Sequence, residues 1–145
     1  MFTKIFVLAC AVTLLCAGTG LCGVYSDIAD EVEAKNGVKE ITYDQFMDIR
    51  DSGEDYKLLD VLAGESYNEG HIEGSLSFPL DEIDEATAAE RLSMDDNIIV
   101  YCGSFQCTAS TAAAQKLSEL GYNVLDYKGG LQEWQEKGNE LISGM

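Results

Sequence analysis

The clearest hydrophobic pattern in this chain is an unbroken apolar run, a short loop and then a helical stripe. Residues 98–101 read IIVY, a β-branched and aromatic run that is typical of a strand buried on both faces of a parallel sheet. Cys102 follows at once. From Thr108 to Leu120, apolar residues recur at helical spacing, at Ala109, Ala112, Ala113, Leu117 and Leu120. The order is therefore strand, tight loop, helix.

Patterns on either side of this unit predict further elements. Strands are predicted at 39–41, 56–61, 75–78 and 123–127, and helices at 42–50, 65–68, 81–92 and 131–137. Thr42 and Gln45 have the spacing of a capping box, and the helix that they begin turns Phe46 and Ile49 inward. The inner face of the 81–92 helix is predicted to be Ile83, Ala86 and Leu92. This alternation predicts an α/β fold, an open and mainly parallel five-stranded sheet flanked by helices on both faces.

The N-terminal segment predicts export. An apolar run, 5–17, follows Lys4, and the small residues 17–20 come next, so residues 1–22 are predicted to be a signal peptide, with a buried helix as the alternative. The mature protein is then expected in the periplasm, or anchored as a lipoprotein through Cys22. Residues 23–37 are predicted to be an acidic linker or a loosely docked helix, residues 38–140 the domain, and 141–145 a tail.

Charge narrows the classes of partner. The chain has 26 acidic and 9 basic residues, a net charge of −17. Binding to phosphates depends on clusters of Lys and Arg, so nucleic acid and an anionic membrane surface are disfavoured as partners. We expect membrane contact only if Cys22 is lipidated.

Cys102 is the leading candidate for chemistry. Ligands of open α/β sheets bind outside the carboxyl ends of the strands, and a loop that enters a helix can direct several backbone N–H groups at one point. Such N–H groups and the helix dipole favour the thiolate, which is the nucleophile. The alternative is a small buried hydrophobic residue.

Other polar or aromatic residues have structural alternatives. Cys107 is separated from Cys102 by the four residues Gly103–Gln106 and could pair with it as a disulfide. One such pair and a single histidine in the whole chain make a poor zinc site. Asp60 is either a functional group or an acceptor of backbone N–H bonds. His71, in a glycine-flanked turn, and Trp134 are interpreted as a structural hydrogen-bonding residue and a core residue.

Two stretches, 58–80 and 98–138, carry a family resemblance. Their motifs are Asp60-Val61, Gly70-His71-Ile72 with Gly74, Tyr101-Cys102, and Gly129-Gly130 with Trp134. With these motifs in this order, the chain resembles a single-domain rhodanese, a rhodanese-like sulfurtransferase of the exported bacterial type, over roughly residues 38–138.

The resemblance implies that Cys102 carries sulfane sulfur as a persulfide, taken from a small donor and passed to a thiol or other thiophilic acceptor, with a partner protein as a further candidate. It implies neither metal nor organic cofactor. Asp60 and His71 match positions that would support the fold and the loop. The residues expected to bind the anionic persulfide are Gly103, Ser104, Phe105, Gln106, Cys107 and Thr108.

Departures from the family pattern leave alternatives open. The arginines common in this loop are replaced by Gly103 and Cys107, and the one after the Asp-Val pair by Leu62, so thiosulfate is in doubt as the donor. A phosphatase or arsenate reductase would need such an arginine. Cys107 either resolves a Cys102 persulfide or sulfenate as a disulfide, making a thiol-disulfide redox device, or only packs in the loop. A non-catalytic binding module is the remaining class.

Overall fold

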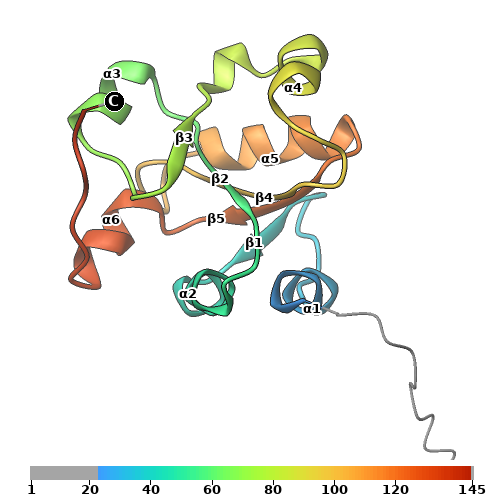
Figure 1. Ribbon diagram of the computed structural model, residues 1–145, viewed down its shortest axis with the longest axis horizontal. Helices are drawn as coiled ribbons and strands as arrows, with labels where there is room; N and C mark the ends of the chain where they lie inside the picture. Colours follow the sequence, from blue (N-terminus) through green and yellow to red (C-terminus); the bar gives the residue numbers. More distant parts are fainter. Residues whose placement is uncertain (1–22, 145) are drawn as a thin grey trace, which may run out of the picture.

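The computed structural model describes residues 23–144. The predicted signal peptide, with Cys10, Cys16 and Cys22, lies outside this range and stays a prediction. Within the range, five strands form one sheet in the order β1-β5-β4-β2-β3, and every neighbouring pair is parallel (Figure 1). The predicted sheet is confirmed. The strands are β1 (Lys39–Ile41), β2 (Lys57–Asp60), β3 (Ser75–Ser77), β4 (Asn97–Tyr101) and β5 (Asn123–Tyr127).

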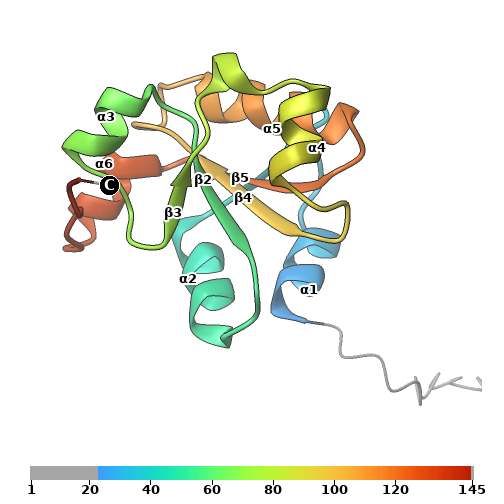
Figure 2. The same ribbon diagram turned by 45° about the horizontal axis from the view of Figure 1, so that its top comes forward.

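Helices cover both faces of this sheet. Figures 1 and 2 show α1 and α2 on one face and α4 and α5 on the other. Trp134 of α6 joins the core on the α1–α2 side and is 5% exposed, which agrees with the predicted core role. The bounds are α1 (Val24–Glu31), α2 (Tyr43–Ser52), α3 (Gly64–Glu69), the 3-10 turn η1 (Leu80–Glu82), α4 (Glu85–Arg91), α5 (Ala109–Glu119) and α6 (Gly130–Glu136).

The alternation of side chains along β4 decides where Cys102 points. Ile98 and Val100 enter the core beneath α4 and α5, whereas Ile99 and Tyr101 enter the core beneath α1 and α2. Successive side chains of a strand point to opposite faces of the sheet. Cys102 continues the first set, and its side chain therefore lies on the α5 face.

Helix α2 begins as predicted. The Thr42 side chain accepts the N–H of Gln45 at 3.3 Å, and the Gln45 side chain accepts the N–H of Thr42 at 3.0 Å, which completes the capping box. Phe46 and Ile49 are both fully buried.

Helix α1 is docked more firmly than the sequence predicted for residues 23–37. Tyr25 has no exposed surface, and Ile28 and Ala29 are buried beside it. The Tyr25 hydroxyl lies 2.8 Å from the carbonyl oxygen of Ile98 and 3.0 Å from that of Asn123, and it accepts the N–H of Ile98 at 3.2 Å. The acidic outer face of this short helix concealed a narrow apolar stripe that reaches the sheet.

The single helix predicted for residues 81–92 is wrong. The chain forms η1, breaks at Ile83, and begins α4 after Asp84, because Asp84 is an N-cap: its carboxylate accepts the N–H of Thr87 at 2.8 Å. The later start also changes the buried face. Ala88 is buried there, and Ala86, predicted to face inward, is exposed.

Candidate active site

The loop that carries Cys102 lies where β4 ends. Residues 103–108 connect the strand to α5, and a turn in which Cys107 N donates to the carbonyl oxygen of Ser104 at 3.0 Å closes its middle. Helix α6 holds the start of the loop: Leu131 N donates to the Cys102 carbonyl oxygen and Gln132 N to that of Gly103, both at 2.9 Å. The loop therefore takes its position from two helices.

Gly130 explains why a glycine pair precedes α6. Its φ is +58°, and a Cβ atom built on it would lie 2.1 Å from the Cys102 carbonyl oxygen. Only glycine allows this close approach with a left-handed backbone. The two loop bonds from Leu131 and Gln132 depend on that approach.

The Cys102 thiol is completely buried. The thiol donates a hydrogen bond to Ser110 Oγ at 3.4 Å, and the Ser110 backbone N–H also points at the sulfur. Burial, followed by the interaction with the Cys107 thiol, raises the pKa of Cys102 above its ordinary value. The pKa was predicted to be lowered, and this prediction is wrong, because burial outweighs the backbone N–H and hydroxyl groups that favour the thiolate.

Cys107 has the environment that was predicted for Cys102. It is half-buried, and the backbone N–H groups of Gly103 and Ala109 point at its sulfur. Burial opposes ionisation here too, but the Cys102 thiol, these N–H groups and the Lys128 charge together lower the pKa of Cys107. The loop amides thus favour negative charge on the second sulfur more than on the first.

A buried polar cluster lies under the loop, on the same face of the sheet. Asp126 has no exposed surface, and its Oδ2 accepts the hydroxyl of Thr111 at 2.9 Å. Lys128 Nζ donates to Thr111 Oγ1 at 2.9 Å and to the Cys107 carbonyl oxygen at 2.5 Å. Ser110 lies near enough to act on the Asp126 carboxylate, although Oδ1 makes no hydrogen bond of ordinary length within residues 23–144. Burial raises the pKa of Asp126.

Sequence reasoning missed Ser110, Asp126 and Lys128. The α5 stripe was drawn through apolar residues, but the inner face that is buried comprises Ser110, Ala113, Ala114 and Leu117. A signal was available: Asp126 interrupts the apolar run of residues 124–127, and a lone carboxylate inside a buried strand needs a polar partner.

The remaining loop residues lie toward the surface. Phe105, Gln106 and Thr108 are exposed, and Gly103 and Ser104 are half-buried. Phe105 lines a hollow of about 270 Å³ beside the end of β1, together with Glu40, Ile41, Thr42, Lys128 and Glu133. This hollow has two carboxylates and one ammonium group.

Asp60 and His71 lie in a neighbouring turn. Asp60 is buried, and its Oδ1 accepts the N–H of Leu62 at 2.9 Å. His71 Nδ1 lies 2.8 Å from the Tyr67 carbonyl oxygen, and the His71 ring stacks on the Tyr67 ring with centroids 3.7 Å apart. Both side chains fasten the segment after β2, and their support of the cysteine loop stays a prediction.

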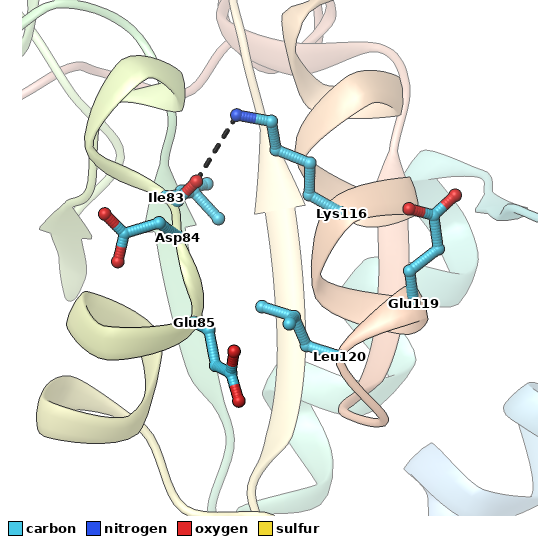
Figure 3. Close-up of a pocket in the computed structure, with 6 residues that line it drawn as sticks. All are labelled: Ile83, Asp84, Glu85, Lys116, Glu119 and Leu120. Atoms are coloured by element: carbon cyan, nitrogen blue, oxygen red, sulfur yellow. Dashed lines mark hydrogen bonds between the residues drawn. The ribbon is translucent and has the colours of Figure 1, made fainter.

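A second hollow, of about 230 Å³, lies at the other end of α5 (Figure 3). Its lining is Ile83, Asp84, Glu85, Lys116, Glu119 and Leu120, and Lys116 Nζ donates to the Ile83 carbonyl oxygen at 3.3 Å. No thiol lines it, since Cys102 and Cys107 lie at the start of α5. This hollow is therefore remote from the two thiols of the cysteine loop.

Residues 23–144 hold neither a cluster of metal-ligating side chains nor a helix able to span a membrane. No three side chains of His, Cys, Asp or Glu in this range are grouped so that they would hold a metal ion. None of the helices in this part of the chain has the length and apolar character needed to cross a bilayer.

Comparisons with known proteins agree with the fold. Residues 29–137 match the family model of the rhodanese-like domain. Thiosulfate sulfurtransferase PspE of Escherichia coli is 33% identical over 75 residues, which cover 52% of this chain and 70% of PspE. The crystal structure of BH2092 from Bacillus halodurans superposes with a TM-score of 0.65 at 34% identity, covering 72% of this chain and 76% of that one. The solution structure of the rhodanese-like domain of Alr3790 from Anabaena gives 0.63 at 25% identity, with 72% and 79% covered.

Proposed function

This chain belongs to the rhodanese-like domain family, and we propose that it is a sulfurtransferase that moves sulfane sulfur through a persulfide on Cys102 to a thiol or other thiophilic acceptor. The observation that carries the proposal is the position of Cys102. It ends the central strand β4, and its own carbonyl is held by the N–H of Leu131 in α6. The similarity to a named thiosulfate sulfurtransferase supports the same reaction class.

The buried thiol has a route for its proton. Cys102 Sγ donates to Ser110 Oγ, and Ser110 lies beside Asp126, whose pKa is raised by burial. A carboxylate with a raised pKa accepts a proton more readily than an ordinary one. We infer that Ser110 passes the thiol proton toward Asp126 when Cys102 attacks, so that a thiol with a raised pKa still reacts as a thiolate.

The transfer itself requires no cofactor. The Cys102 thiolate attacks the outer sulfur of a donor X–S⁻ and forms an S–S bond, while the bond from sulfur to X breaks and X leaves with the electron pair. The product is a Cys102 persulfide anion. Backbone N–H groups near the start of α5, those of Ala109 and Ser110 among them, then stabilise the terminal sulfur. An acceptor thiolate attacks that sulfur and restores Cys102.

The charges near the loop favour some donors over others. Residues 101–115 contain no Arg or Lys, and Lys128 supplies positive charge beside Cys107. A sulfonate is best held by the forked guanidinium of arginine, and the adjoining hollow carries Glu40 and Glu133. We therefore expect polysulfide, or a persulfide of another thiol, to be a better donor than thiosulfate.

Intact-mass measurement tests the proposal. The reduced, desalted chain is incubated with thiosulfate in one sample and inorganic polysulfide in another, and excess donor is removed. A Cys107→Ser variant should gain about 32 Da, the mass of one sulfur atom, and a Cys102→Ser variant should gain none. Addition of cyanide should remove the added mass and release thiocyanate.

The same experiment separates the proposal from a non-catalytic binding module. If the Cys107→Ser variant keeps its reduced mass with both donors while Cys102 still reacts with an alkylating agent, Cys102 does not carry sulfur and the proposal is overturned. If polysulfide and thiosulfate load the protein equally fast, the proposal stands but the donor preference is wrong.

A further inference from the structure

The cysteine loop holds a second sulfur atom next to the first. Cys107 packs against the core cluster that contains Cys102, and each thiol shifts the pKa of the other. Cys102 has no exposed surface, whereas Cys107 is half-buried. A solvent-borne thiol acceptor has less access to Cys102 than this neighbour has.

The groups around Cys107 prepare it for attack. The N–H groups of Gly103 and Ala109 point at its sulfur, and the ammonium of Lys128 lies beside it, bonded to the Cys107 carbonyl oxygen at 2.5 Å. These groups lower the pKa of Cys107, so its thiolate forms at a pH at which Cys102 is still a thiol. The thiolate is the form that attacks sulfur–sulfur bonds.

Resting on the proposed function, we propose that Cys107 resolves the Cys102 persulfide within the same loop, releasing hydrosulfide and leaving a Cys102–Cys107 disulfide. The Cys107 thiolate attacks Cys102 Sγ, a new S–S bond forms, and the persulfide bond breaks with its electron pair on the outer sulfur. That sulfur leaves as hydrosulfide with one proton. The two cysteines are oxidised and the sulfane sulfur is reduced, so the electrons balance without another oxidant.

A thiol reductant completes the cycle. Two molecules of a small thiol, or one dithiol, reduce the disulfide and regenerate both cysteines. For a donor X–S⁻, the sum of both stages is the conversion of X–S⁻ and two thiols into X, hydrosulfide and one disulfide. The chain would therefore link sulfane sulfur to the thiol pool, and the immediate product would be free hydrosulfide.

The test follows one turnover without external thiol. Reduced full chain is mixed with one equivalent of inorganic polysulfide, quenched with an alkylating agent at successive times, and analysed for intact mass and for hydrosulfide. Wild type should show the persulfide only briefly and end as a disulfide, with about one more hydrosulfide per chain than Cys107→Ser releases during loading. Cys107→Ser should keep its persulfide roughly tenfold longer or more, until an external thiol is added.

A Lys128→Met variant sharpens the test. Without the ammonium charge the pKa of Cys107 should rise, and disulfide formation should need a higher pH than in wild type. Alkylation of Cys107 as a function of pH gives an independent readout. A cysteine that only packs in the loop would show the shift in alkylation and no change in persulfide lifetime.

The outcomes are distinguishable. If wild type keeps its persulfide as long as Cys107→Ser does, Cys107 is not a resolving thiol, and the proposed sulfurtransferase function is untouched. If Cys107→Ser gains no sulfur at all, the proposed function fails and this inference fails with it. If Cys102→Ser gains sulfur on Cys107, the order of the two cysteines is the reverse of the one proposed.

Discussion

The two faces of the sheet are built differently. On the face covered by α1 and α2, large aromatic rings pack together: Phe46 stacks on Tyr127 with centroids 4.8 Å apart and lies 6.0 Å from Trp134. On the face covered by α4 and α5, Ala113 and Ala114 share a core cluster with Cys102, and the polar residues Ser110 and Asp126 are also buried there. The first face is a largely aromatic core that also encloses the Asp60 carboxyl, and the second combines a core with the two reactive thiols.

The difference between the two faces shows where this fold bears the free-energy cost of burying polar groups. Buried polar groups stabilise little and are expensive when unpaired, so a fold that carries Asp126 and a buried thiol on one face needs compensating apolar burial elsewhere. The aromatic face supplies that burial. We expect substitutions on the aromatic face to change stability, and substitutions on the α5 face to change reactivity or the pH dependence of stability.

The largest effect should come from Phe46→Ala on the aromatic face. Loss of this fully buried ring should lower the free energy of unfolding by about 3–5 kcal/mol. Urea unfolding measures it, with Asp48→Ala on the exposed side of α2 as a control expected to stay within about 0.5 kcal/mol. The division between the faces breaks down if folded Phe46→Ala protein also reacts with polysulfide at an altered rate.

The next largest effect is expected where α6 meets the cysteine loop. Gly130→Ala places a Cβ atom against the Cys102 carbonyl, so it should cost about 3 kcal/mol and slow persulfide formation at the same time. Gly138→Ala is the matched control: its φ is +89°, but the space around it is open. The control should cost only about 1–2 kcal/mol, from backbone strain alone, and leave sulfur loading unchanged.

A smaller loss is expected for Tyr25→Phe, which keeps the ring of α1 and removes only its hydroxyl. The Ile98 N–H loses the Tyr25 hydroxyl that accepts its hydrogen bond at 3.2 Å, and the free energy of unfolding should fall by about 1–2 kcal/mol. Urea unfolding at neutral pH measures this loss. An unchanged midpoint would mean that α1 adds nothing to the aromatic face beyond covering it.

The smallest effect is a change of slope with pH for Asp126→Asn. Burial raises the pKa of Asp126 in the folded state, so this group stabilises the fold below its unfolded pKa and loses that contribution as pH rises through its folded pKa. Asparagine does not ionise. The variant should therefore gain stability relative to wild type as pH rises from about 3.9, the ordinary pKa of Asp, toward neutral pH, as measured by urea unfolding. A difference that is constant over that range contradicts the assignment of Asp126 as a buried titrating group.

The aromatic face was readable from sequence, and the reactive face only in part. Phe46, Ile49 and Trp134 could be placed because helical spacing and a capping box depend on near neighbours in the chain. Cys102 could be located in the same way, since it directly follows an apolar strand. Its pKa could not be predicted, because that depends on how deeply the loop sits and on Cys107 and Ser110, which only the folded loop brings to the thiol.

Ser110 and Lys128 show the limit most clearly. An apolar stripe identifies a helix face by its hydrophobic residues, and a serine on that face carries no periodic signal. Lys128 reaches Cys107 from a segment 21 residues later in the chain, by way of the packing of β5 beside β4. Contacts of this kind come from strand order, which hydrophobic patterns do not specify.

The strand order also limits when the sheet can form during synthesis of the chain. β5, from the last quarter of the sequence, occupies the place between β1 and β4, so β1 is separated from the other three strands until residues 123–127 are synthesised. A nascent chain that ends before them cannot join its first strand to the rest. Lys128 and α6, which hold the cysteine loop, are synthesised after β5, so both cysteines acquire their final surroundings only when nearly the whole polypeptide has left the ribosome.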